Sequence, residues 1–201
     1  MDSVAFAFCD AVVGTIRKLP WLHVPFPDDK WNKALQDHSA NRKRYQLHVS
    51  YWNDKWFYKL YNGSNALLTT LVQQVGPKYL RFDCIECMTH GRYVTETSKE
   101  ELHALIKSLK PFLNFPSLYL FDDASKFPEN DLDQLLSSFA KINICLFYSS
   151  SNGRSAIEFA KQLMRQDTLV KTITILGARD LLAAAIEDYR ATGRVNNLAH
   201  G

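Results

Sequence analysis

The chain has 201 residues, with 24 Lys and Arg against 21 Asp and Glu, so its formal net charge is +3. This near balance argues against a dedicated nucleic-acid-binding protein. Hydrophobic residues make up 46% and charged residues 22%, with 8 Gly and 7 Pro, which is typical of soluble globular proteins and excludes disordered and collagen-like chains. We therefore expect one domain, or one domain with a small appendage.

The cysteines and the apolar runs bear on the cellular compartment. The four cysteines, at positions 9, 84, 87 and 145, are too few and too unevenly spaced for a secreted disulfide scaffold. Asp10 interrupts the first apolar stretch, and no positive charge precedes it, so a signal peptide is not expected. No apolar run reaches the roughly 20 residues that span a bilayer. The sequence thus predicts a protein of the cytoplasm or nucleus with reduced cysteines and no membrane partner.

The first predicted element is a helix over residues 4–19. One apolar face recurs at every fourth position, as an amphipathic helix requires; its members are Val4, Phe8, Val12 and Ile16. The opposite side is apolar as well, because it carries Phe6 and Cys9. A helix this apolar needs cover on more than one face. That cover comes either from the rest of the chain or from a partner protein.

A connector and a second helix complete the N-terminal part. Residues 19–27 hold three prolines, which forbid a regular helix and favour an extended segment. Asp28 and Asp29 then lie where the helix macrodipole favours acidic residues, so the second helix begins there. Trp31, Ala34, Leu35 and His38 fall on one face of this helix. We interpret residues 1–40 as a helical unit.

Residues 41–76 are predicted to form a β-hairpin and a connecting helix. Aromatic and β-branched residues alternate on both sides of Asn53-Asp54, which is the pattern of a hairpin with a tight turn. Residues 66–75 follow as a short helix that Gly76-Pro77 ends.

Residues 77–201 repeat a short strand followed by an amphipathic helix. The predicted strands are 79–85, 117–121, 142–148 and 171–176, and the predicted helices are 99–113, 130–140, 155–166 and 179–190. Strand after helix after strand implies an α/β fold with a mainly parallel sheet. Leu118, Ile144 and Ile173 lie 26 and 29 residues apart, close to the period of leucine-rich-type repeats. This spacing fits both a curved solenoid of repeats and one compact sheet.

Cys84, Cys87 and His90 are the candidate metal ligands. Thiolates and imidazoles suit a tetrahedral zinc ion, and the two-residue spacings bring three such groups close in sequence. No second paired element lies nearby, and Cys84 falls within a predicted strand. Burial in that strand is the favoured interpretation, and we predict neither a metal nor a cofactor.

A second set of candidates lies at the carboxyl ends of the predicted strands, where α/β proteins bind ligands. Asp122 and Asp123 are placed to hold a magnesium ion, and Ser151 and Arg154 to bind a phosphate at a helix start. The spacing matches neither a P-loop nor a dinucleotide fingerprint, and no catalytic motif is present. A small α/β enzyme or phosphate-ligand-binding protein is therefore the alternative hypothesis, and no catalytic residue is assigned.

The N-terminal unit resembles an F-box. An apolar helix opening with Val4, Ala5 and Phe6, a proline-rich connector, and a helix bearing Trp31 and Leu35 are similar to that motif's hydrophobic opening and Trp-bearing close. Together with the strand–helix repeats, the whole chain is similar in outline to the divergent F-box and F-box-associated families of nematodes. We therefore expect three parts: a helical unit over 1–40 that the resemblance makes F-box-like, the β-hairpin and connecting helix over 41–76, and the leucine-rich-repeat-like strand–helix domain over 77–201.

The same resemblance implies a function. Such a chain would be a non-enzymatic interaction protein, a substrate-recognition adaptor of a cullin-RING ubiquitin ligase. Its N-terminal helices would bind the adaptor subunit of the ligase, and its repeats would hold a protein substrate; no nucleic acid is expected. The residues implied to form or support the adaptor surface are Val4, Phe6, Phe8, Val12, Ile16 and Trp31.

Overall fold

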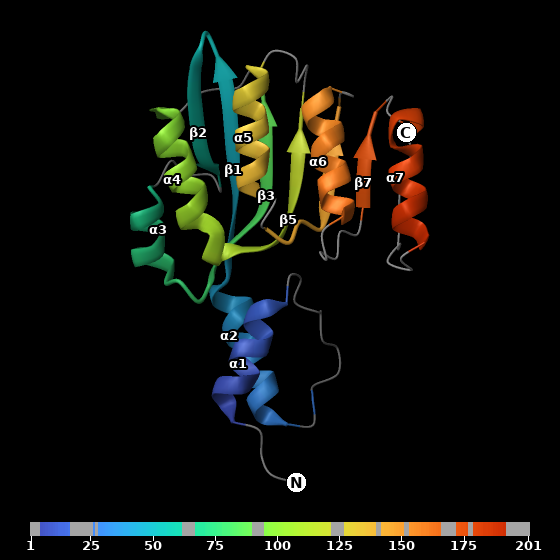
Figure 1. Ribbon diagram of the computed structural model, residues 1–201. Helices are drawn as coiled ribbons and strands as arrows, with labels where there is room; N and C mark the ends of the chain where they lie inside the picture. Colours follow the sequence, from blue (N-terminus) through green and yellow to red (C-terminus); the bar gives the residue numbers. More distant parts are fainter. Residues whose placement is uncertain are drawn as a thin grey trace.

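The computed structural model is an α/β protein built on one seven-stranded sheet (Figure 1). It describes residues 5–16, 26, 28–61, 67–89, 95–121, 127–139, 142–150, 153–165, 172–176 and 179–191. The strand order is β4-β2-β1-β3-β5-β6-β7. Two helices, α1 and α2, hang below the amino-terminal edge of the parallel strands as a separate pair (Figure 1).

The pair consists of α1 (Phe6–Thr15) and α2 (Asp29–Asn41), which pack against each other. Asp28 is the N-cap of α2, and its side chain accepts a hydrogen bond of 2.7 Å from the Lys30 amide, as the acidic start of this helix predicts. Helix α1 is shorter than the predicted 4–19, because the backbone turns extended at Ile16.

The hairpin prediction is confirmed by β1 (Lys43–Trp52) and β2 (Lys55–Tyr61), an antiparallel pair. Asn53 and Asp54 connect them with φ of 49° and 60°, the left-handed conformation that a tight hairpin turn needs. Helix α3 (Leu68–Val75) follows and ends at Gly76, whose φ is 79°. Because β1 pairs in parallel with β3, the hairpin belongs to the same sheet as the later strands.

The strand–helix alternation is also confirmed. The remaining elements are β3 (Leu80–Met88), β4 (Thr95–Thr97), α4 (Lys99–Leu109), the 3-10 turn η1 (Lys110–Phe112), β5 (Leu113–Leu120), α5 (Glu129–Phe139), β6 (Leu146–Ser149), α6 (Arg154–Arg165), β7 (Thr172–Ile175) and α7 (Arg179–Ala191). Of these, β4 was not predicted. It adds a short antiparallel strand outside β2.

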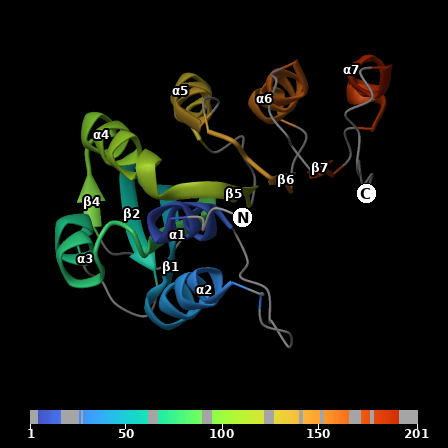
Figure 2. The same ribbon diagram turned by 90° about the horizontal axis from the view of Figure 1, so that it is seen from below.

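The parallel strands β1, β3, β5, β6 and β7 follow one another across the sheet in chain order. Because each crossover moves one strand further in the same direction with the same hand, the helices fall on one side. Figure 2 shows α4, α5, α6 and α7 on one face of the sheet. The main core lies between these helices and the strands, and its largest fully buried side chains include Phe82, Phe139 and Phe147. Of the described elements, these four helices cover one face of the parallel strands and do not cover the other.

Candidate functional site

Helix α1 is apolar on both its inner and outer sides. Cys9 and Val13 are fully buried against α2. On the outer side, Ala7, Phe8 and Ala11 are exposed, and Phe8 keeps 56% of its surface accessible. A surface helix of a globular protein ordinarily turns charged residues outward, but Asp10 is the only charged residue of α1. The prediction of a helix that is apolar on more than one side is confirmed.

An aromatic cluster continues this surface onto α2. The ring of Trp31 contacts Phe8 edge-on, with centroids 6.2 Å apart, and Phe26 at 6.1 Å. Phe26 is 42% exposed, so two of the three rings present large faces to solvent. Lys33 lies over the Phe6 ring, with its ammonium 5.5 Å from the ring centroid. We call Phe6, Phe8, Phe26 and Trp31 the aromatic patch.

Phe26 is held in place although its side chain is exposed. The amide oxygen of Asn32 accepts a hydrogen bond of 2.8 Å from the Phe26 backbone NH, and the amide nitrogen of Asn32 donates one of 2.8 Å to the Phe26 carbonyl. Two hydrogen bonds from one side chain fix both the position and the direction of a backbone segment. The patch is therefore organised before any partner binds, which lowers the ordering cost of association.

A polar junction attaches α1 and α2 to the sheet. Two arginines cap the carboxyl end of α1: Arg42 donates to the carbonyls of Val13 (2.8 Å) and Ile16, and Arg81 of β3 donates to that of Gly14 (2.9 Å). Cations at a helix carboxyl terminus are favoured by the macrodipole, and their N–H groups supply donors to the terminal carbonyls. The sequence patterns did not predict this junction, because the junction is made by contacts between residues that are distant in sequence.

Carboxylates balance the other side of the junction. Lys78 lies between Asp10 (2.9 Å) and Asp37 (3.2 Å), and the Tyr79 hydroxyl donates to Asp37 at 2.5 Å. The hydrogen bond from Tyr79, with that from Lys78, lowers the pKa of Asp37. The hydrogen bond from Lys78 to Asp10 is the main cause that raises the pKa of Lys78. These charges remain paired at neutral pH.

His38 occupies the centre of the junction and is 1% exposed. Arg42 lies 3.3 Å from Nδ1 of His38 and can only donate, so Nδ1 accepts and the imidazole proton is on Nε2. Nε2 faces Asp10 at 3.2 Å. Burial, followed by the positive charge of Arg42, lowers the pKa of His38 despite the nearby carboxylate. Burial also lowers the pKa of Arg42 to about 10, so Arg42 stays charged and His38 neutral at pH 7.

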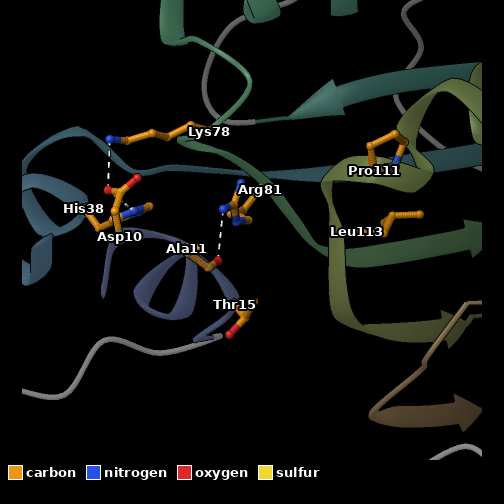
Figure 3. Close-up of a pocket in the computed structure, with 9 residues that line it drawn as sticks. Asp10, Ala11, Thr15, His38, Lys78, Arg81, Pro111 and Leu113 are labelled. Carbon is orange, nitrogen blue, oxygen red and sulfur yellow. Dashed lines mark hydrogen bonds and ion pairs between the residues drawn. The ribbon is translucent and has the colours of Figure 1, made fainter. Parts of the chain in front are cut away.

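A cavity of about 330 Å³ lies between the helix pair and the sheet (Figure 3). Residues of both units line it, among them Asp10, Thr15, Lys78, Arg81 and Leu113. Figure 3 shows Lys78 directed at Asp10 and Arg81 directed at the end of α1. The charged groups that line the cavity thus already contact one another or the backbone. This arrangement joins the two units.

The structure brings together part of the predicted adaptor surface. Phe8 and Trp31 are in ring contact, and Phe6 packs beside the small core of the pair. Val12 and Ile16 are half-buried, with Ile16 at the capped end of α1. Val4 lies outside the described residues. Phe26 was not predicted, since its proline-rich segment gives no periodic signal, and Asn32 was not predicted because its two hydrogen bonds to the Phe26 backbone appear only in the folded chain.

The candidate metal ligands do not converge. Cys84 and Cys87 lie three residues apart on β3, so they point to opposite faces: Cys84 donates weakly to Glu86 at 3.7 Å, and Cys87 is in the main core. Burial raises the pKa of the Cys87 thiol, which disfavours the thiolate that a metal needs. His90 lies outside the described residues. Among those described, no three His, Cys, Asp or Glu side chains cluster as a metal site.

The alternative ligand site falls mostly outside the described residues. Asp122, Asp123 and Ser151 are not among them, and Arg154 is an exposed residue at the start of α6. No described helix is long and apolar enough to cross a membrane.

Comparisons with protein-family models, curated proteins and solved structures returned no match. The surfaces of the molecule itself therefore provide the evidence on its function.

Proposed function

We propose that this protein is a non-enzymatic interaction protein that binds a partner through the outer side of α1 and the aromatic patch. The observation that carries the proposal is that the exposed side of α1 presents Ala7, Phe8 and Ala11, with 56% of the surface of Phe8 accessible. Exposed apolar surface of this kind is a feature of docking sites. Large aromatic side chains supply most of the binding free energy in such interfaces.

The shape of the molecule supports this proposal. The helix pair projects from one edge of the sheet, so its outer side is accessible while its other side is bound to the sheet through the junction (Figure 1). A helix that offers apolar anchors from a rigid mount fits helix-in-groove docking. The sheet unit remains available for a second protein.

The resemblance of the N-terminal unit to an F-box supports a specific choice of partner. On this proposal the partner is the adaptor subunit of a cullin-RING ubiquitin ligase, the sheet unit holds a protein substrate, and the protein acts in the cytoplasm or nucleus. Phe6, Phe8 and Trp31 would be the central contacts. Phe26, fixed by Asn32, would extend them.

The test is co-expression of the full chain with the adaptor subunit, followed by size-exclusion chromatography and a titration. We expect the wild-type chain to co-elute and Phe8→Asp to weaken binding by at least about 30-fold, because it places a charge in a desolvated apolar contact. Phe8 lies in the first turn of α1, where the macrodipole favours an acidic residue. The variant should therefore fold.

Leu67→Asp is the matched control. Leu67 is 59% exposed, close to the exposure of Phe8, and it is the N-cap of α3, a position that accepts Asp. Its substitution should leave binding unchanged. Normal binding by Phe8→Asp would remove α1 from the interface, and a folded wild-type chain that ignores the adaptor would refute the ligase assignment.

A further inference from the structure

The sheet face opposite α4–α7 carries a second organised surface. Leu118, Leu120 and Phe147 point into the main core, so the intervening Tyr119 and Tyr148 point to the other face. The parallel register aligns Glu86, Tyr119 and Tyr148 side by side on β3, β5 and β6. Of the described helices, α4, α5, α6 and α7 lie together on the opposite side (Figure 2).

Three aromatic rings form a continuous platform on this face. Tyr119 and Phe121 are stacked, with centroids 5.5 Å apart and planes within 5°. Tyr148 lies 6.1 Å from Tyr119 and 5.9 Å from Phe121. All three side chains are half-buried, and the Phe121 amide donates to the Cys87 carbonyl at 2.8 Å, which holds Phe121 in line with β5. The three rings thus pack against one another, and part of each side chain remains accessible.

Glu86 borders the platform with a carboxylate. Its register partner on the other side is His48, whose Nε2 lies 3.4 Å from a Glu86 oxygen and 3.1 Å from the Gln46 amide oxygen. Burial lowers the pKa of His48, so this imidazole is neutral at pH 7 and does not cancel the charge of Glu86. Lys59, in the same row, lies beyond His48 over the Tyr61 ring, 5.0 Å from its centroid. The aromatic side of the row therefore carries a net negative charge.

We propose that this platform binds a basic side chain, arginine or lysine, of an extended segment of a partner protein. The negative faces of aromatic rings attract a cation, and a carboxylate at their edge adds charge complementarity and a hydrogen-bond acceptor. An arginine guanidinium fits best, because it is planar, stacks on rings and pairs with a carboxylate at its edge. The four residues of this basic-residue site are Glu86, Tyr119, Phe121 and Tyr148.

Nucleic acid is disfavoured on the same surface. Aromatic rings on an open sheet also stack with bases, but such surfaces add cations that follow the phosphates. Among the described residues, the charged side chain in register with these rings is Glu86, and its carboxylate repels a phosphate.

The site deepens the proposed function by naming the chemistry of a substrate segment, yet it does not depend on docking through α1. Phe121 follows the carboxyl end of β5, whereas α1 and α2 lie below the amino-terminal edge of the strands (Figure 1). The two surfaces can therefore be disabled one at a time. A chain with Phe8→Asp should lose its adaptor and keep the basic-residue site.

The experiment titrates the full chain with a labelled heptapeptide of alternating glycine and arginine, followed by fluorescence anisotropy. The paired probe replaces each arginine by citrulline, which has nearly the same shape and no charge. We expect the citrulline peptide to bind roughly tenfold more weakly. Glu86→Gln should weaken arginine-peptide binding by about fivefold, and Tyr148→Leu by a similar factor, because leucine keeps apolar area and lacks the π face.

Glu96→Gln is the matched control. It removes the same charge from β4, where Glu96 pairs with Lys55 at 2.8 Å, and it should change affinity by less than about twofold. Circular dichroism and a cooperative thermal transition establish that each variant is folded. Equal binding of the two peptides, equal effects of Glu86→Gln and Glu96→Gln, or tighter binding of a single-stranded oligothymidine than of the arginine peptide would each overturn the site.

Discussion

The sheet unit and the helix pair differ in what holds them together. The sheet unit buries one continuous apolar core between strands and α4–α7. Among the described residues, the helix pair has a separate core of four buried hydrophobic side chains, Cys9, Val13, Ala34 and Leu35. Its attachment to the sheet is polar, through two arginines and a group of paired charges. The pair thus depends on directional contacts, and the sheet on buried area.

This difference has a consequence for stability. Apolar burial contributes in proportion to area and is shared by many residues, so the sheet unit should unfold as one cooperative structure. A polar junction made of few groups opens when one of them is removed, and such local opening costs less than global unfolding. The surface that we assign to partner binding lies on the less stable part.

Phe147→Ala should cause the largest loss of unfolding free energy, and this loss should affect the sheet unit. Phe147 is fully buried and packs edge-on against Phe159 with ring centroids 5.2 Å apart. Removing such a ring leaves a cavity and costs about 3–5 kcal/mol. Urea denaturation followed by circular dichroism measures the loss. A cost below about 1 kcal/mol would show that β6 is not part of the cooperative core.

Arg81→Met should act on the helix pair. Its loss leaves the Gly14 carbonyl without its donor at 2.9 Å, and an unsatisfied group of this kind costs about 1–3 kcal/mol. We expect faster amide hydrogen exchange in α1 and α2, measured by mass spectrometry, with little change in the sheet strands.

Arg44→Met is the control for the arginine substitution. Arg44 lies on the neighbouring strand β1, its side chain is 43% exposed, and its guanidinium lies 3.5 Å from the carboxylate of Asp83. It should leave exchange in α1 unchanged. Uniform acceleration across the whole chain by Arg81→Met would mean that the helix pair and the sheet unfold together.

Local patterns predicted most of the elements correctly. The turn at Asn53-Asp54, the acidic start of α2 and the glycine after α3 each act through neighbouring residues, so periodicity and turn chemistry suffice. The start of β5 was predicted too late, at Ser117, because Pro116 argues against a strand. The strand begins at Leu113 and passes Pro116 through an irregularity at Phe115, whose φ is 48°.

The candidate sites were less predictable than the fold. The double-sided apolarity of α1 is visible in its own residues, and the structure bears it out. The junction joins residues as distant as Gly14 and Arg81, and no spacing rule relates them. Tyr119 and Tyr148 stand at alternating positions of predicted strands, but their importance depends on which sheet face the helices leave open. Which face stays open depends on where the four helices α4–α7 pack, and this is a property of the whole fold.

A smaller effect should appear as a pH dependence that starts in the junction. Because burial and Arg42 lower the folded-state pKa of His38, the unfolded chain binds a proton at His38 that the folded chain excludes. Stability contributed by neutral His38 is complete above the unfolded pKa of about 6.5. It is lost progressively as the pH falls below that value.

His38→Asn isolates this contribution. Asn keeps an oxygen near the position of Nδ1, which can accept from Arg42 as His38 does, and it does not titrate. The wild-type chain should lose more stability between pH 7.5 and pH 5.5 than the variant, as measured by urea denaturation at both values. His48, whose pKa burial also lowers, is present in both chains and cancels in the comparison. Equal losses would mean that His38 accepts its proton in the folded state, with Asp10 rather than burial controlling the junction.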